Sequence, residues 1–414
     1  MTQKPTIAVI GAGMVGTCCA LHLQDAGFDV TLVDRGGPGE ATSAGNLGAF
    51  GVASCPPAAM PGIVRKVPAM LLDEMAPLKL RWSHVPRALP WFLRFIANSK
   101  PERVEANAAA RQSLLDQAHA AVDHLIAEAD ATDLISRTGL MFTFEKEATF
   151  EAASYAFDLR RRNGTVLDLL DGNEARQVEP ALSTNVVRAI RVADFAHTLD
   201  PMKLVQALAA LFVRRGGSLA PRTVSGFEID PGGVRALRSA EGDLPVERIV
   251  LAAGVWSRPL AAKLGTSVPL EAERGYHSMF NGCDMRLNIA LTSADRNVAI
   301  TPMADGIRVG GTAEFAPPDA TPNYARARMV ARHAEALLPG LRSDNVTEWM
   351  GPRPSHPDSK PVIDRAPRHA NVWFAFGHDH LGLTMGGITG KLIAELVTGR
   401  TPSVDLAPFR ADRF

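Results

Sequence analysis

The sequence has 414 residues, which is long for one hydrophobic core, so we expect two domains. Its 44 Lys and Arg residues balance its 44 Asp and Glu residues without a basic run, which argues against nucleic acid as a partner. No apolar stretch reaches the length of a membrane span, and four cysteines without a CxxC pair are typical of a reducing cytoplasm. Composition therefore favours a cytoplasmic protein with two domains.

The first predicted elements, at residues 6–35, follow a nucleotide-binding pattern: an apolar strand, a turn with three glycines, a helix over 14–25 and a second strand that ends at Asp34. The glycines permit a tight turn, close approach of a pyrophosphate and close packing of helix on strand. The helix N-terminus attracts phosphates, and Asp34 suits ribose hydroxyls. A secretory signal peptide, the alternative, has no use for the glycines or the acid. The predicted contacts with a dinucleotide are Gly11, Ala12, Gly13, Met14, Val15, Gly16, Asp34 and Arg35.

A glycine-rich polar segment at 36–54 holds no helical or strand period, so we expect a loop. It contains S-x-G-N-x-G at 43–48. The glycine turn followed by this motif resembles the D-amino acid oxidase superfamily of flavoproteins, and more narrowly its bacterial D-amino acid dehydrogenase branch. The resemblance implies that FAD contacts Ser43, Asn46, Leu47 and Gly48. A surface loop without cofactor contact is the alternative.

The segment at 60–99 is rich in proline, tryptophan and arginine. It suggests either a patch that touches a membrane, in keeping with a dehydrogenase that reduces quinone, or packing at a domain junction. Two prolines argue against a good amphipathic helix there. Apolar residues from Leu114 to Ile126 recur at helical spacing and predict one long helix. A strand at 139–145 and a helix at 155–164 follow.

Asp200 followed by Pro201 predicts the start of a helix that runs to Arg215. Strand-like pieces follow at 218–224, 226–229, 234–238 and 246–253. In relatives such an antiparallel excursion interrupts the parallel sheet, which implies that the backbone of Val224 contacts the adenine. The last piece ends in small residues, and the resemblance to the paired flavoprotein motifs favours FAD over NAD. This second motif places Ala252, Ala253, Gly254 and Trp256 at the cofactor.

Strand-like runs alternate with turns over 269–353 and predict the sheet of a substrate domain. By resemblance, Arg353 holds the substrate carboxylate, and a guanidinium suits this role because it grips a carboxylate with two parallel hydrogen bonds. A structural ion pair is the alternative for Arg353. Tyr276 is expected to reach the same carboxylate. Arg274 is assigned either a substrate role or a packing role.

The C-terminal part predicts a strand at 372–376, a G-H-x-H-x-G-x-T turn at 377–384 and a helix from about Gly386 to Val397. In relatives this turn lies at the pyrimidine side of the flavin, where helix N–H groups stabilise negative charge. His380 is expected nearer the flavin than His378, and a metal site is not predicted because no third ligand is near. The expected flavin contacts are Gly382, Leu383 and Thr384.

These patterns predict an α/β fold with a Rossmann-type FAD domain at 1–60, 198–262 and 355–414. An α+β substrate domain with a mainly antiparallel sheet takes 61–197 and 263–354. The expected reaction is oxidation of a D-amino acid, or of a D-proline or hydroxyproline-type imino acid, by hydride transfer from Cα to non-covalently bound FAD. Glycine or sarcosine oxidation, an NAD-dependent dehydrogenase and a non-catalytic flavin protein are alternatives. The electron acceptor (quinone, another carrier or oxygen), a peripheral contact with the inner membrane face and the oligomeric state are left open.

Overall fold

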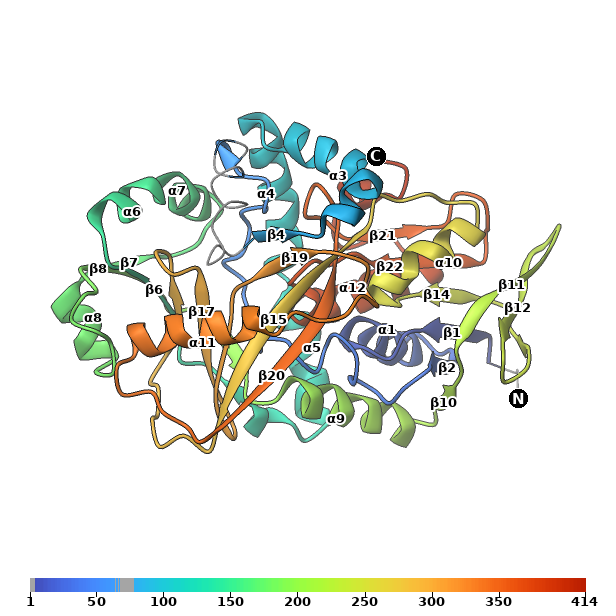
Figure 1. Cartoon of the computed structure of the whole chain (residues 1–414). Helices are drawn as coiled ribbons and strands as arrows, with labels where there is room; N and C mark the ends of the chain where they lie inside the picture. Colours follow the sequence, from blue (N-terminus) through green and yellow to red (C-terminus); the bar gives the residue numbers. More distant parts are fainter. Residues whose placement is uncertain (1–3, 64, 66, 68–77) are drawn as a thin grey trace.

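The computed structural model describes residues 4–63, 65, 67 and 78–414 (Figure 1). A six-stranded sheet in the order β10-β2-β1-β14-β22-β21 is parallel except for its last strand. The strand, helix and strand predicted at the N-terminus are confirmed. The strands of this sheet are β1 (Thr6–Ile10), β2 (Asp29–Asp34), β10 (Ser218–Pro221), β14 (Ile249–Leu251), β21 (Val362–Arg365) and β22 (Val372–Phe376).

Helices α1 (Met14–Asp25) and α12 (Gly382–Val397) pack against each other beside this sheet. Glycine makes the contact close, because a Cβ at Gly390 would lie 2.6 Å from the backbone of Cys18. The two adjacent cysteines, Cys18 and Cys19, are fully buried as small apolar groups. Helix α12 begins at Gly382, one turn before the predicted start at Gly386, so its N-terminal N–H groups belong to the glycine-rich turn itself.

A ten-stranded sheet forms the other half of the fold, and all its pairings are antiparallel except β16 with β6 and β19 with β4. The predicted α/β class with a mainly antiparallel second sheet is therefore confirmed. Its strands are β4 (Leu78–Leu80), β6 (Leu140–Phe144), β7 (Asp168–Asp171), β8 (Arg188–Val192), β15 (Glu271–Asn281), β16 (Ala290–Ser293), β17 (Val298–Met303), β18 (Gly306–Gly310), β19 (Ala313–Phe315) and β20 (Asn345–Ser355).

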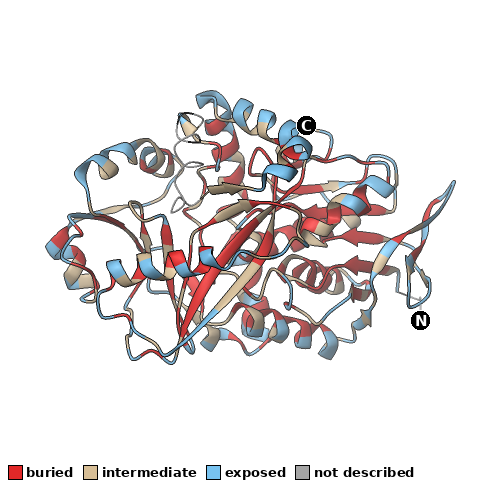
Figure 2. Cartoon of the chain, in the orientation of Figure 1, coloured by how far each residue is buried: buried red, intermediate tan, exposed pale blue. Residues whose placement is uncertain are grey.

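The other strands of the described residues form two three-stranded sheets. The predicted antiparallel excursion consists of β11 (Val224–Asp230), β12 (Gly233–Ser239) and β13 (Leu244–Pro245), and β3 (Ala49–Phe50), β5 (Ile135–Ser136) and β9 (Ala196–Thr198) pair nearby. Buried residues run through both large sheets (Figure 2). The other α-helices that the described residues form are α3 (Val85–Asn98), α4 (Pro101–Leu115), α5 (Ala118–Glu128), α6 (Glu147–Ala152), α7 (Ser154–Arg162), α8 (Gly172–Val178), α9 (Pro201–Arg214), α10 (Ser257–Lys263) and α11 (Ala325–Leu337).

One helical prediction needs correction and another is confirmed. The single helix expected from Leu114 to Ile126 is two helices, α4 and α5, which meet at residues 116–117. Leu114 and Ile126 are both buried, so the apolar spacing continues across the break and cannot reveal it. The N-cap at Asp200 is confirmed, since its carboxylate accepts a hydrogen bond from the backbone N–H of Lys203 at 3.0 Å.

Part of the segment at 60–99 lies outside the described residues, but its second half forms α3 despite two prolines. Pro86 lies in the first turn, where a missing N–H costs nothing, and Pro90 lies inside the helix. Trp91 packs inward and donates a hydrogen bond to the carbonyl of Ser355 at 3.0 Å. The outer face of α3 exposes Leu89, Leu93 and Ile96. In the described residues no helix is long and apolar enough to serve as a membrane span.

Five buried histidines make the fold sensitive to acid. Burial is the largest cause of their lowered pKa values, about 4 for His22 and His197 and about 3 for His277, His356 and His378. Unfolded histidine has a pKa near 6.5, so below that pH the unfolded chain binds protons that the folded chain does not. Stability is therefore complete above pH 6.5 and is lost as the pH falls towards 4, by up to about 1.4 kcal/mol per pH unit for each histidine.

Urea unfolding between pH 7.5 and 5.0 measures this slope. We expect His197→Asn to make the slope shallower by about one proton, because it removes a group that is protonated in the unfolded chain and not in the folded one over this range. Equal slopes for the wild type and His197→Asn would contradict the assignment of His197 as a neutral buried group.

Candidate active site

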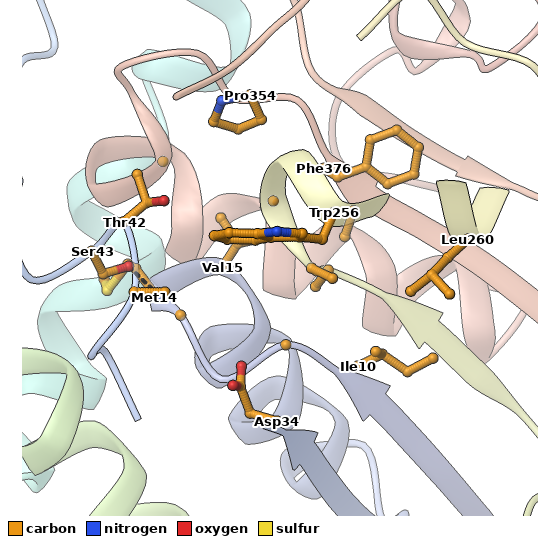
Figure 3. Close-up of a pocket in the computed structure, with 18 of the residues that line it drawn as sticks. Ile10, Met14, Val15, Asp34, Thr42, Ser43, Trp256, Leu260, Pro354 and Phe376 are labelled. Atoms are coloured by element: carbon orange, nitrogen blue, oxygen red, sulfur yellow. Dashed lines mark hydrogen bonds between the residues drawn. The ribbon is translucent and has the colours of Figure 1, made fainter. Parts of the chain in front are cut away.

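One long cavity opens at the carboxyl ends of the parallel strands, where open α/β sheets bind ligands. In Figure 3, Asp34 and Pro354 lie on opposite sides of this cavity, with Val15 and Trp256 between them. Most predicted cofactor residues line it: Gly11, Gly13, Met14, Val15, Asp34, Arg35, Ser43, Asn46, Val224, Ala252, Ala253, Gly254, Trp256, Gly382 and Leu383.

The glycine turn before α1 leaves room that any side chain would fill. Gly11 has φ +109°, and a Cβ there would lie 2.5 Å from the carbonyl oxygen of Ala252. A Cβ at Gly16 would lie 1.8 Å from the carbonyl oxygen of Gly11. The N-cap residue of α1 is Gly13, which has no side chain, and Ser43 Oγ from the following loop accepts a hydrogen bond from the N–H of Met14 at 3.1 Å. These residues fit the pyrophosphate of a dinucleotide.

Asp34 ends β2 at the edge of the cavity. Its carboxylate accepts hydrogen bonds from the N–H groups of Ala12, at 2.7 Å, and Gly36, at 2.9 Å. These bonds fix the carboxylate, and its remaining lone pairs suit ribose hydroxyls. Next to it the Arg35 guanidinium lies 4.3 Å from the centre of a Trp256 ring, which orients both side chains.

Five predicted cofactor residues do not line the cavity. Ala12 and Gly16 support the glycine turn: the N–H of Ala12 donates to the Asp34 carboxylate, and Gly16 lies close against the carbonyl of Gly11. Gly48 has φ +79° beside the carbonyl of Thr198, and Leu47 packs near Gly310. Thr384 has a structural role, because its hydroxyl donates to the carbonyl of Ala49 and accepts from the N–H of Gly51.

Sequence reasoning missed several residues of the cavity wall. Several of them lie at or just after the ends of β2, β10 and β22, and the parallel order of β10 beside β2 was the information that the sequence lacked. They are Val33, Thr42, Arg222, Thr223, Ser225, Leu260, Lys263, Pro354, Phe376, Gly377, His378 and Asp379.

The turn at 377–382 reverses the expected order of its two histidines. His378 lines the cavity and its Nε2 lies 2.9 Å from Thr389 Oγ1. His380 is half exposed and does not line the cavity; its Nδ1 lies 3.5 Å from Asp379 Oδ2. His378 is therefore the better candidate for cofactor contact. Among the described residues, one cluster has spacing suited to a metal ion, His22, Asp25 and His124, and it lies on α1 and α5 away from this turn.

Arg353 lies on β20, one residue before the cavity-lining Pro354. Its Nη1 donates to Glu273 Oε1 at 2.8 Å and to the carbonyl of Thr312 at 3.1 Å. Within the described part of the chain both hydrogen bonds use Nη1, so the edge formed by Nε and Nη2 is available to a carboxylate. The ion pair that was the structural alternative for Arg353 is therefore present. It does not use Nε or Nη2, which can still bind a carboxylate.

Tyr276 does not join Arg353, which corrects the expectation that it reaches the same substrate, and Arg274 takes the packing role that was one of its two alternatives. On β15, Glu273 is paired with Arg353 and Tyr276 with Met350, and residues an odd number apart project to opposite faces. His277, on the face of Arg353, contacts the carbonyl of Gly45 in the cofactor loop at 3.1 Å.

The other face of β15 carries α11, since Ser278 Oγ donates to the carbonyl of Ala327. There Tyr276 donates to Glu314 at 2.6 Å, and buried Arg274 lies 3.5 Å from the same carboxylate. Burial is the main reason that the pKa of Tyr276 rises to about 12. Both side chains therefore belong to a polar cluster behind the sheet.

The fold and this cavity define a protein of the type that binds a dinucleotide across the carboxyl ends of a parallel sheet. The family model described as FAD dependent oxidoreductase, DAO, matches residues 6–396. The chain belongs to this family.

Individual relatives align with this chain over all or nearly all of its length. A D-amino-acid oxidase of Bradyrhizobium diazoefficiens is 35% identical, with 100% of both chains covered. A D-amino acid dehydrogenase of Paramagnetospirillum magneticum is 32% identical over 99% of this chain and 98% of the relative. Among solved structures, glycine oxidase from Geobacillus kaustophilus shares the fold with a TM-score of 0.79 at 21% identity, and each chain is fully covered.

Proposed function

We propose that this FAD-dependent oxidoreductase oxidises the Cα–N bond of a D-amino acid, or of a D-proline or hydroxyproline-type imino acid. The observation that carries the proposal is Arg353, which directly precedes the cavity-lining Pro354: Glu273 holds its Nη1, while Nε and Nη2 have no hydrogen bond among the described residues. Relatives named D-amino acid oxidase and D-amino acid dehydrogenase support the substrate class. Glycine or sarcosine is the second candidate, favoured by the similarity in fold to glycine oxidase.

Bound FAD supplies the acceptor for a hydride from Cα, and the resulting imine hydrolyses in water. The protein's own task is positioning. Arg353 holds the carboxylate by two parallel hydrogen bonds, which orients Cα towards the cavity. The N-terminus of α12 begins at Gly382 on the cavity wall, where its N–H groups favour negative charge.

Anaerobic bleaching of the flavin tests the proposal. We expect yellow protein, with absorbance at about 450 nm from the cofactor itself, to lose its colour with at least one D-amino acid or D-imino acid. Bleaching by glycine or sarcosine alone would favour the second candidate, and no bleaching across the panel would contradict an amino-acid substrate. Readmitting oxygen then separates an oxidase, which regains its colour quickly, from a dehydrogenase that needs quinone or another carrier.

We also propose that the FAD is bound without a covalent link. All four cysteines are buried as free thiols, and burial raises the pKa of Cys18 to about 12, so these thiols are poor nucleophiles. Acid precipitation should leave the yellow colour in the supernatant. A yellow pellet would contradict this part of the proposal.

The outer face of α3 supports a peripheral contact with an anionic membrane. Leu89, Leu93 and Ile96 are exposed on this helix, and Trp82, which precedes it, is 69% exposed. Residues 78–100 contain five Lys and Arg residues and no Asp or Glu. Apolar side chains flanked by cations are typical of a helix that lies in the interface of a bilayer.

Sedimentation with vesicles that contain anionic lipid checks this contact. We expect the double substitution Leu89→Glu and Leu93→Glu to abolish binding, because it adds charge repulsion and removes the apolar face. Val166→Glu, at another exposed apolar position, should change nothing. Failure of the wild-type protein to sediment with these vesicles would contradict the membrane contact and leave the amino-acid activity unaffected.

A further inference from the structure

The guanidinium of Arg353 lies across a glycine. A Cβ built on Gly275 would stand 2.4 Å from Nη2, 2.6 Å from Cζ and 3.0 Å from Nε of Arg353. Gly275 and Arg353 share one face of the β15 and β20 pair, because Gly275 is two residues from Glu273, the residue opposite Arg353. The backbone of Gly275 does not have a positive φ, so this glycine is not explained by a turn. Its absent side chain makes room for the guanidinium.

Glu273 holds the same guanidinium from the other end. Its Oε1 accepts from Arg353 Nη1 at 2.8 Å, and both side chains are mostly buried. Together with the carbonyl of Thr312, this carboxylate determines which edge of the guanidinium remains free. A charged pair with an additional backbone acceptor restricts rotation more than an exposed ion pair does.

The second carboxylate oxygen of Glu273 is connected through hydrogen bonds to a residue that lines the cofactor cavity. Glu273 Oε2 lies 3.1 Å from Ser355 Oγ, which lies 2.8 Å from Asp379 Oδ1, so the one hydroxyl proton is shared between two acceptors. Asp379 lines the cavity, has φ +56° and donates its backbone N–H to the carbonyl of Pro354 at 3.0 Å. Burial alone would raise the pKa of Asp379, but His380, Arg111 and Ser355 hold it well below its usual range.

We propose that Gly275 and Glu273 are positioning residues for Arg353, and that Ser355 and Asp379 connect this carboxylate site to the turn that lines the cofactor cavity. The inference rests on the proposed function, because it needs a substrate carboxylate on Arg353. It predicts that Glu273 stays paired with Arg353 while substrate is bound. The opposite arrangement, in which Glu273 competes with the substrate for Arg353, predicts tighter substrate binding once the carboxylate is removed.

A double-mutant cycle tests the positioning role on the intact holoenzyme. Gly275→Ala should raise the KM of the best substrate, and the Kd of its 2-oxo acid product measured by the change in flavin absorbance, by about tenfold or more. The content of FAD should not change. In the Arg353→Met background the same substitution should change both constants less than about twofold, because the contact no longer exists. A further tenfold loss in that background would overturn the role of Gly275.

Glu273→Gln is a second test, which addresses the other contact of Arg353. It keeps the shape and one acceptor oxygen but removes the charge, and we expect a rise in Kd of about threefold to tenfold. Glu271→Gln is the matched control: it lies on the same strand and face and pairs with Arg258 and His84 instead. A lowered Kd in Glu273→Gln would show competition and overturn the proposal, as would equal effects of the two glutamate substitutions.

The outcomes also separate this inference from the proposed function. If Arg353→Met alone leaves KM unchanged, the assignment of the carboxylate site fails. If Arg353→Met raises KM while Gly275→Ala and Glu273→Gln act independently of it, only the positioning role fails. A smaller shift of the flavin spectrum on binding of the 2-oxo acid to Ser355→Ala is the expected sign of the connection to the cavity; an unchanged shift would contradict that connection.

Discussion

Replacing Arg353 with methionine is expected to raise the KM for the amino-acid substrate about 100-fold or more while FAD stays bound. Two charge-assisted hydrogen bonds to the carboxylate are lost, each contributing about 1.5–3 kcal/mol, and about 1.4 kcal/mol corresponds to a factor of ten. Methionine keeps much of the apolar stem, so the effect reports the guanidinium rather than packing. Steady-state kinetics with the best substrate of the bleaching panel measures the change.

Arg296→Met is a matched control for this substitution. Arg296, in the turn between β16 and β17, is comparably buried and forms its own two hydrogen bonds to Glu145, at 2.6 and 2.9 Å. Its loss should lower stability without changing KM. Arg353→Lys should give an intermediate KM, because lysine restores the charge without the planar fork. Equal KM values for the wild type and Arg353→Met would remove the main support for an amino-acid substrate.

The N-terminal nucleotide-binding motif could be predicted from the sequence because its chemistry is local. The conformation of Gly11, the helix N-terminus and the carboxylate of Asp34 all depend on residues within one βαβ unit. For the same reason the helix that begins after Asp200 was located closely. Such features follow from the chain itself without knowledge of its neighbours.

The faces of β15 could not be predicted in this way. Strand alternation places Tyr276 opposite to its neighbours, but which face meets the cavity depends on the pairing of β15 with β20, and on the position of α11. From the sequence, Tyr276 was expected at the substrate and Arg274 was left between a substrate role and a packing role, whereas Gly275 between them was given no role. In the fold, only the glycine lies on the face of Arg353.

The turn at 377–382 shows a second limit. Sequence reasoning placed His380 nearer the flavin than His378, whereas in the structure His378 lines the cavity. The backbone at Asp379 has φ +56°, which rotates the next residue outwards and leaves His380 half exposed. A single residue in the left-handed region thus decides the histidine that lines the cavity.

The second large effect is expected from Gly11→Val, which should yield protein that purifies without flavin. A Cβ at this position would lie 2.5 Å from the carbonyl oxygen of Ala252 and 2.9 Å from the Cα of Ala253, and both are backbone atoms that cannot move aside. The turn must therefore shift away from the ends of β1 and β14. The N–H groups at the N-terminus of α1 then no longer point towards the pyrophosphate.

Gly27→Ala separates this loss of binding from simple backbone strain. Gly27 has φ +90°, close to the value at Gly11, but a Cβ there meets nothing within 4 Å. The strain alone costs roughly 1–2 kcal/mol, so Gly27→Ala should lower the unfolding midpoint and keep its full content of FAD. Flavin absorbance relative to protein, measured on both purified variants, compares them directly. Full flavin content in Gly11→Val would mean that the glycine turn does not receive the cofactor, whereas its loss from that variant alone would assign the pyrophosphate to the turn.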